Sequence, residues 1–191
     1  MQGAMFDTSV PGECLHSIRN ADVIVAELDR LSPLLNSVMR RILVSDHVAA
    51  SKFGTDSPID HPARERQALE QVKCEAGALG LAPDGAVGFF RDQIAASKLV
   101  QRGLFDQWST RPAEAPLVRP DLNRIRVVID RITTEILYGL KSAQIPQIRL
   151  SNCPIGMMIS AGFNSSFHQL DSLHRRALSV ALKSVCNQGA G

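Results

Sequence analysis

The sequence predicts an all-α protein, and three observations support this prediction. Apolar side chains recur at helical spacing over most of the chain. Prolines and glycines mark the breaks between these segments, as they do at helix starts and ends. No segment gives a clear strand or hairpin signal, and no internal repeat is found. A chain of 191 residues suits one domain, so we expect a single helical bundle.

The first helical region is divided by Pro33. Residues 14–31 have helical spacing, but a proline inside a helix removes a backbone hydrogen bond, so we expect a break or bend there. Ser32 and Pro33 match an N-cap followed by proline at the first helical position, which predicts a new helix over 32–52. Gly54 then ends this helix.

Four more helices are predicted, each bounded by proline or glycine signals. The segment 109–120 contains three prolines and is expected to be a surface linker. The predicted helices cover residues 62–81, 83–108, 120–142 and 165–185.

Composition excludes several classes of function. The 21 basic and 19 acidic residues give a net charge of +2, so a nucleic-acid footprint, which needs clustered and unbalanced lysines and arginines, is not expected. No apolar run approaches the roughly 18 residues that a membrane span requires. No His or Cys stands at zinc-ligand spacing from another, so we expect no metal site.

Two cations on the predicted helix 32–52 share one face. Arg41 and Lys52 are eleven residues apart, which is three turns plus about 20°, and their backbones lie roughly 16 Å apart. Two long side chains at this spacing can grip opposite ends of a small anion. The ordinary alternative is a pair of solvated surface charges.

Other polar residues occur where a helix does not favour them. Arg64 falls in the first turn of its helix, where a cation opposes the helix dipole, although Glu65 can compensate it. Ser97 and Gln101 form an i,i+4 pair among small neighbours, which a ligand can approach closely; an exposed polar edge is the alternative. Arg126 follows an apolar stripe, and a salt bridge is its default role.

Taken together, these residues resemble the AroQ-type chorismate mutases, and most closely their exported gamma subclass. The resemblance covers roughly residues 33–187. It rests on a set of residues in order along the chain: Arg41, Lys52, Pro58-Ile59, Arg64-Glu65, the run from Phe89 to Lys98, Gln101, Trp108, the proline-rich linker, Pro120-Asp121-Leu122, Arg126 and two late cysteines. We therefore divide the chain into an N-terminal extension over 1–31, made of an expression remnant and a possible short helix, and a chorismate mutase domain over 32–187.

The resemblance implies a fold and an activity. The fold is a single-domain helical bundle of the AroQ type. The activity is the rearrangement of chorismate to prephenate, a unimolecular Claisen reaction without cofactor, metal or covalent intermediate. Such an enzyme acts by positioning its substrate and by stabilising charge that develops on the ether oxygen.

The resemblance also implies roles for individual residues. Arg41 holds the carboxylate on the enolpyruvyl side, and Arg64 faces the same part of the substrate. Lys52 donates to the ether oxygen and touches that carboxylate, while Gln101 makes the second contact to the oxygen. Ser97 binds the ring carboxylate. Because an amide does not titrate, Gln101 predicts no steep loss of activity between about pH 5 and 8.

Three further positions are implied less uniformly across the family. Arg126 matches an arginine that comes from the same chain in the gamma subclass and from a partner subunit in intertwined relatives. Glu65 matches a position that accepts from the substrate hydroxyl in some relatives. His61 stands where many relatives have Asp, and we expect a surface histidine at a helix start.

The cysteines bear on the compartment. By resemblance, Cys153 and Cys186 form a disulfide that closes a loop of about 34 residues. A disulfide implies a periplasmic or secreted protein whose signal peptide is absent from this sequence. Cys14 and Cys74 have no counterpart; they pair with each other or remain buried thiols, and we favour the latter.

The resemblance further implies a homodimer with a complete site in each chain, with chorismate as the partner molecule and neither nucleic acid nor membrane. The competing hypothesis is a non-catalytic exported module that binds a small dicarboxylate or a partner protein. The presence of both ether-oxygen donors, Lys52 and Gln101, favours the enzyme, because a pure binder does not need them.

Overall fold

The computed structural model describes residues 12–143, with side chains from Leu31 onward, and residues 170–184. Every regular element in these residues is a helix, so the predicted all-α class is confirmed. The elements are α1 (Gly12–Lys52), α2 (Pro62–Ala78), α3 (Pro83–Thr110), the short 3-10 helix η1 (Pro112–Glu114), α4 (Leu122–Ala143) and α7 (Ser172–Ala181).

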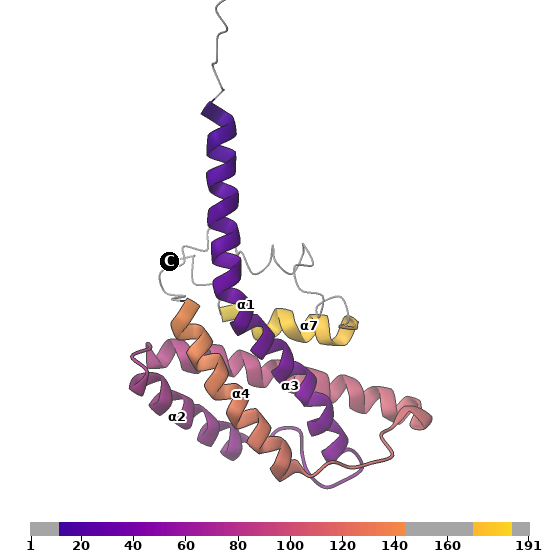
Figure 1. Cartoon of the computed structure of the whole chain (residues 1–191). Coiled ribbons are helices and arrows are strands. Elements are labelled where there is room, and N and C mark those ends of the chain that lie inside the picture. Colours follow the sequence, from indigo (N-terminus) through magenta and orange to yellow (C-terminus); the bar gives the residue numbers. More distant parts are fainter. Residues whose placement is uncertain (1–11, 144–169, 185–191) are drawn as a thin grey trace, which may run out of the picture.

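Helix α1 does not break at Pro33. It runs continuously from Gly12 to Lys52, so the prediction of a new helix capped by Ser32 is wrong. A proline inside a helix costs about 3 kcal/mol. Leu31 and Leu34 on either side of it are almost fully buried, and each buried leucine contributes roughly 1.5–3 kcal/mol. Figure 1 shows that α1 changes direction part-way along its length, as expected of a proline-containing helix.

The predicted starts and stops of the other helices are close to those observed. Helix α1 ends at Lys52, and Gly54 follows with φ of +69° in the left-handed region that favours glycine. Gly80 has φ of +74° just after α2. Helix α3 runs two residues beyond its predicted end, to Thr110, and α7 begins at Ser172. The predicted start of this last helix, at 165, lies outside the described residues.

The helices pack into one core. Helix α1 packs against both α3 and α4, α2 packs on α3, and α7 lies across α3 and α1 (Figure 1). Gly139 lets α4 approach α1 closely, since a Cβ there would lie 3.1 Å from Cα and Cβ of Leu34. The largest fully buried side chains belong to Phe90, Leu31, Leu34, Ile42, Ile132, Ile136, Leu137, Leu178 and Leu182.

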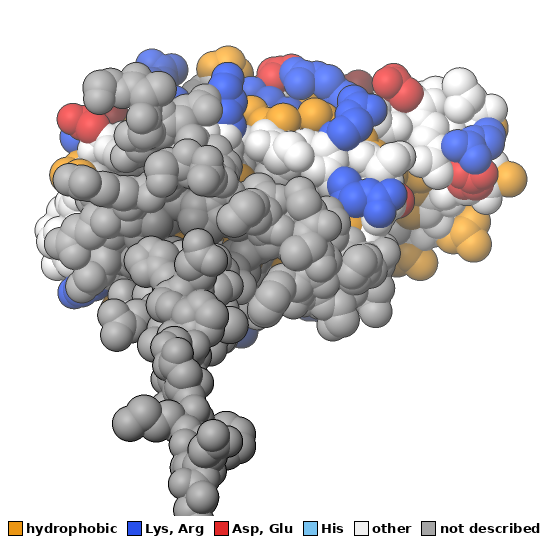
Figure 2. All heavy atoms as spheres, turned by 90° about the horizontal axis from the view of Figure 1, so that it is seen from above, with side chains coloured by type: hydrophobic (Ala, Val, Ile, Leu, Met, Phe, Trp, Pro, Cys, Tyr) orange, Lys and Arg blue, Asp and Glu red, His pale blue; other side chains and the backbone are white. Residues whose placement is uncertain are grey.

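The surface carries charges of both signs. In Figure 2, basic side chains on the described part of one face lie among acidic and apolar ones. Of the helices in the described ranges, none combines the length and the apolar character that crossing a membrane requires.

Candidate active site

A cavity of about 470 Å³ opens between α1, α2, α3 and α4 and is bordered by the connection between α1 and α2. It brings together residues from distant parts of the sequence. Every site residue predicted from the sequence lines it: Arg41, Lys52, Arg64, Glu65, Ser97, Gln101 and Arg126.

Arg41 presents a buried donor to this cavity. One terminal nitrogen donates to Thr133 Oγ1 at 3.0 Å and to the Ile129 carbonyl at 3.4 Å. The guanidinium carbon lies 5.6 Å from the centre of the Phe90 ring. The Nε atom is buried and has no hydrogen-bond partner among the described residues. A buried unpaired donor costs stability, so an acceptor from a bound ligand would stabilise this atom.

Burial also changes the acidity of Arg41. Desolvation lowers the pKa of its guanidinium to about 10, and Asp130 opposes this shift. The side chain therefore keeps its full charge near neutral pH while being poorly solvated. A poorly solvated cation attracts an anion more strongly than a solvated one does.

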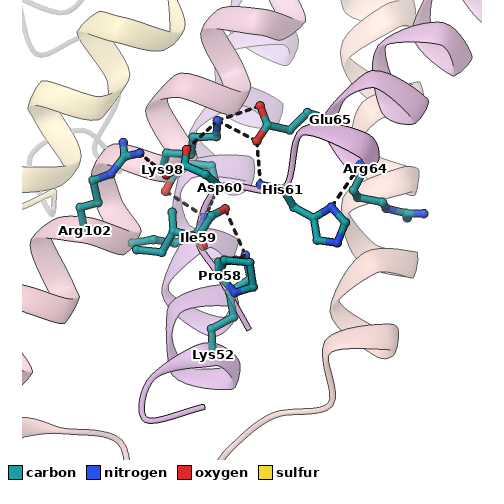
Figure 3. Close-up of polar contacts among 11 residues, drawn as sticks. Lys52, Pro58, Ile59, Asp60, His61, Arg64, Glu65, Lys98 and Arg102 are labelled. Atoms are coloured by element: carbon teal, nitrogen blue, oxygen red, sulfur yellow. Dashed lines mark hydrogen bonds and ion pairs between the residues drawn. The ribbon is translucent and has the colours of Figure 1, made fainter. Parts of the chain in front are cut away.

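Lys52 reaches into the cavity from the last turn of α1. Its Nζ donates to the carbonyl oxygens of Pro58 at 2.9 Å and Ile59 at 3.4 Å, as Figure 3 shows. An ammonium has three donors, so these two bonds leave one for a ligand. The pKa of Lys52 is lowered, mainly by desolvation and then by the charge of Arg126, while Asp60 and Glu65 oppose the shift.

Ser97 and Gln101 are joined on α3. Gln101 is buried, and its Nε2 donates to Ser97 Oγ at 3.1 Å and to the Ser97 carbonyl at 3.2 Å. Gln101 Oε1 is buried without a partner among the described residues. Ser97 Oγ also accepts from Ser45 Oγ at 2.9 Å, which leaves its own proton free to donate. The pair is therefore part of the cavity wall and not an exposed edge.

Arg64 and Arg126 lie at the mouth of the cavity. Arg64 is exposed and donates to Gln67 Oε1 at 3.1 Å. Arg126 is half-buried and donates to Asn123 Oδ1 at 2.9 Å, and the salt bridge expected as its default is not formed with any described residue. Both keep further guanidinium nitrogens available, because each fork carries five donors.

The four cations share one property. Among the described residues, no carboxylate lies within 4.0 Å of any of them. Of the other described lysines and arginines, five form ion pairs with Asp or Glu and nine do not, so these four are set apart by lining one cavity. We refer to Arg41, Lys52, Arg64 and Arg126 as the cavity cations.

A second set of charges is balanced internally. Lys98 Nζ lies 2.7 Å from Glu65 and 3.0 Å from Asp60, and Arg102 lies 2.6 Å from Asp60 (Figure 3). Glu65 also accepts from the backbone N–H of His61 at 3.1 Å. Two cations thus meet two carboxylates. We call Asp60, Glu65, Lys98 and Arg102 the connection cluster, because they join α2 and α3 to the connection between α1 and α2.

His61 is the surface histidine at a helix start that the sequence led us to expect. It is exposed and occupies the N-cap of α2, where its Nδ1 accepts from the backbone N–H of Arg64 at 3.3 Å. It also borders the cavity.

Two functional candidates were not found from the sequence. Ser45 is almost fully buried and supports Ser97, and its position between Arg41 and Lys52 at helical spacing was a signal for it. The second is Lys98, which directly follows Ser97 and for which the sequence predicted no function. The rest of the wall combines polar residues, among them Asp56 and Asp130, with an apolar part that suits a small carbon ring: Val48, Pro58, Ile59, Ala68, Ile94, Leu122 and Ile129.

The predicted cysteine chemistry is only partly visible. Cys74 is exposed and free, so the expectation that it is a buried thiol is wrong. Cys153 and Cys186 lie outside the described residues, as does the side chain of Cys14. Within the described ranges, no group of three or more His, Cys, Asp or Glu side chains is arranged to hold a metal ion.

Comparison with known proteins matches the family model "Chorismate mutase type II" over residues 25–102. The chain is 31% identical over 156 residues to a protein named secreted chorismate mutase from Mycolicibacterium smegmatis, covering 82% of this chain and 86% of that one. It is also 31% identical over 163 residues to a protein of the same name from Mycobacterium tuberculosis, covering 82% and 78%.

Solved structures agree with these matches. A chorismate mutase from Burkholderia thailandensis superposes with a TM-score of 0.73 at 32% identity, covering 82% of this chain and 99% of that one. One from Burkholderia phymatum gives a TM-score of 0.75, also at 32% identity, covering 85% and 99%. Family model, sequence relatives and fold agree, and the chain belongs to the type II chorismate mutases, a family of isomerases.

Proposed function

We propose that this protein converts chorismate to prephenate in the cavity between α1, α2, α3 and α4. The observation that carries the proposal is that the four cavity cations line one cavity and have no carboxylate within 4.0 Å among the described residues. Chorismate carries two carboxylates, a hydroxyl and an ether oxygen. A cavity of about 470 Å³ is within the range that holds a small molecule.

The reaction needs positioning and charge stabilisation only. The ether carbon–oxygen bond breaks while a carbon–carbon bond forms within the same molecule, so no group or proton has to be exchanged with the protein. Holding the substrate in its compact conformer lowers the entropic part of the barrier. Donors aimed at the ether oxygen bind its growing negative charge more tightly in the transition state than in the ground state, which accelerates the reaction.

Lys52 is the first of these donors. The Pro58 and Ile59 carbonyls occupy two of its three N–H groups and fix the ammonium, so the third is available to the ether oxygen. The neighbouring enolpyruvyl carboxylate lies against the same charge. Arg41 Nε, buried and unpartnered, supplies the second donor to that carboxylate, and Arg64 at the mouth faces the same part of the substrate.

Gln101 is the second donor to the ether oxygen. Its Nε2 is bonded to Ser97, and Oε1 has no partner among the described residues. A rotation of the side chain that releases one of these bonds directs an Nε2 N–H to the substrate. Because Gln101 is uncharged, this contact does not depend on pH in the ordinary range.

The other end of the substrate meets Ser97 and Arg126. Ser97 Oγ accepts from Ser45 and has its own proton left for the ring carboxylate. Arg126, from the same chain, adds a guanidinium to the site. Glu65 accepts from the ring hydroxyl with lone pairs that Lys98 and the His61 N–H do not use.

We infer that the protein is exported and acts as a homodimer with a complete site in each chain. The two curated relatives are named secreted, which supports export to the periplasm or the medium. Arg126 lines the cavity together with Arg41, Lys52 and Arg64 of the same chain, which supports a site that takes this arginine from its own subunit. The Cys153–Cys186 disulfide belongs to this inference, and the mass of the peptide joining these residues under non-reducing conditions tests it.

Purified protein added to chorismate tests the proposed function directly. We expect the absorbance of chorismate to fall with time in proportion to protein concentration, with prephenate as the product. The competing function is a non-catalytic module that binds a small dicarboxylate. A protein that binds chorismate in a calorimeter but leaves its absorbance unchanged would establish the binder and overturn the enzyme.

A further inference from the structure

We propose that Lys98 is a positioning residue, which holds the connection between α1 and α2 so that the Pro58 and Ile59 carbonyls aim Lys52 into the cavity. This inference rests on the proposed function. It gives a role to a side chain that borders the site but whose charge is not available to the substrate.

The contacts of Lys98 reach two separate elements. From α3, its Nζ lies 2.7 Å from Glu65 in the first turn of α2 and 3.0 Å from Asp60 in the connection. Figure 3 shows the ammonium of Lys98 between these two carboxylates. One side chain therefore joins three parts of the chain at a single point.

The connection passes this constraint to Lys52. Asp60 follows directly after Pro58 and Ile59, and the carbonyls of these two residues accept from Lys52 Nζ at 2.9 and 3.4 Å. The path from Lys98 to Lys52 thus consists of one ion pair, a short piece of backbone and two hydrogen bonds. Moving Asp60 moves the two acceptors that orient the Lys52 ammonium.

Of the two cations that pair with Asp60, Lys98 is the more buried. The side chain of Lys98 is 20% exposed, whereas that of Arg102, the other partner of Asp60, is 53% exposed. An ion pair that is less solvated is screened less than an exposed one. Lys98 and Glu65 also line a second hollow of about 420 Å³ on the outer side, so they form the wall between it and the site.

Charge balance separates Lys98 from the cavity cations. The connection cluster contains two cations and two carboxylates, joined by three ion pairs of 3.0 Å or less. Its net charge is zero, so Lys98 adds little attraction for a dianion. A direct substrate contact would change KM, whereas a positioning role changes mainly kcat, because it affects a donor used in the transition state.

The first experiment compares Lys98→Met, Lys98→Arg and a matched control, Arg40→Met. Arg40 also joins two helices by a 2.7 Å ion pair, with Glu135, but lies outside the cavity lining. We expect Lys98→Met to lower kcat by about 10- to 100-fold, as a small misplacement of a reacting group does, with KM within about threefold. Lys98→Arg should regain most of kcat, and Arg40→Met should keep the wild-type kcat.

The second experiment tests whether Lys98 acts through Lys52. In a Lys52→Ala background, Lys98→Met should lower the remaining rate by less than about twofold, because the group that it orients is gone. Full additivity of the two losses would overturn the proposal, as would a Lys98→Met enzyme with wild-type kcat. If Lys98→Met does not fold, Asp60→Asn replaces it, with the same kcat loss and non-additivity expected. If the wild-type protein does not convert chorismate, the proposed function itself is wrong, and not only the role of Lys98.

Discussion

The cavity cations and the connection cluster adjoin one another. The charges of the cluster are paired with one another, whereas those of the cavity cations are not paired with acids of the described residues. In the cluster, each cation has a carboxylate within 3.0 Å. Around the cavity, the four cations have backbone carbonyls, a threonine hydroxyl and amide oxygens as partners, and no acid within 4.0 Å among the described residues. Lys98 also lines the cavity, but Glu65 and Asp60 balance its charge, so within this wall only the four cavity cations lack a nearby carboxylate among the described residues, and their charge is available to an anionic ligand.

The difference has an energetic consequence. Paired charges contribute modestly to stability, while a buried unpaired donor such as Arg41 Nε costs stability in the free protein. Substitutions should therefore separate along this line. Removal of a cavity cation should reduce activity without loss of stability, and removal of a paired buried cation that lies away from the cavity, such as His174, should do the reverse.

The largest effect is expected for Arg41→Met. This change removes the buried donor to the enolpyruvyl carboxylate while filling most of the same space. We expect kcat/KM to fall by about 10³-fold, comparable to the loss of one oxyanion donor. The melting temperature should stay equal or rise, since an incompletely paired buried cation has been removed. A steady-state assay combined with a thermal melt measures both. A lower melting temperature with unchanged kcat/KM would show that Arg41 stabilises the fold and does not bind the substrate.

A smaller and conditional effect is expected for Gln101→Glu. A carboxylic acid donates to the ether oxygen only when protonated, whereas the amide donates at any ordinary pH. The wild-type rate should change little between about pH 5 and 8. The variant should lose about 10- to 100-fold at pH 8 and recover toward pH 5. An acidic optimum in the wild-type enzyme, or a flat profile in the variant, would exclude Gln101 as the donor.

The smallest effect concerns a buried cation that is paired. His174 on α7 lies between Asp46, at 2.8 Å from Nε2, and Asp171, at 2.7 Å from Nδ1. The hydrogen bond to Asp46, followed by that to Asp171, raises the pKa of His174 from its usual 6.5 to about 9. A raised pKa stabilises the fold fully below about pH 6.5, and this stabilisation is lost as the pH rises through about 9.

The variant His174→Gln should therefore be less stable than wild type at pH 6 by about 1–3 kcal/mol, since both carboxylates are partly exposed to solvent. The difference in the free energy of unfolding between wild type and variant should become smaller toward pH 9.5. Urea unfolding at the two pH values measures this difference. Because His174 does not line the cavity, the kcat at pH 7 should be unchanged. If this difference were the same at both pH values, the packing of His174, and not its positive charge, would account for the stability.

Much of the fold was predictable from local signals. Pro62, Pro83 and the left-handed glycines Gly54 and Gly80 fix helix ends through backbone constraints that act within a few residues. The continuity of α1 through Pro33 was not predictable in the same way. It depends on burial of Leu31 and Leu34 against other helices, and local propensity does not contain that energy.

In the site, too, some features were predictable from local spacing and others depend on tertiary structure. Regular spacing along α1 and α3 places Arg41, Lys52, Ser97 and Gln101 on the faces that meet at the cavity. What the sequence did not reveal is which charges are neutralised. Lys98 and Lys52 look alike in the sequence, and only the path of the connection after α1 brings Asp60 to Lys98 and leaves Lys52 with carbonyl oxygens.

The rate of chorismate conversion by Lys52→Ala, beside wild type, tests the central claim most directly. Lys52 has no ion pair to lose among the described residues, so its replacement should leave the melting temperature within a few degrees of wild type. The account predicts a fall in kcat of about 10²- to 10³-fold, because one of the two donors to the ether oxygen is removed. A folded Lys52→Ala protein with a rate within about tenfold of wild type would contradict it.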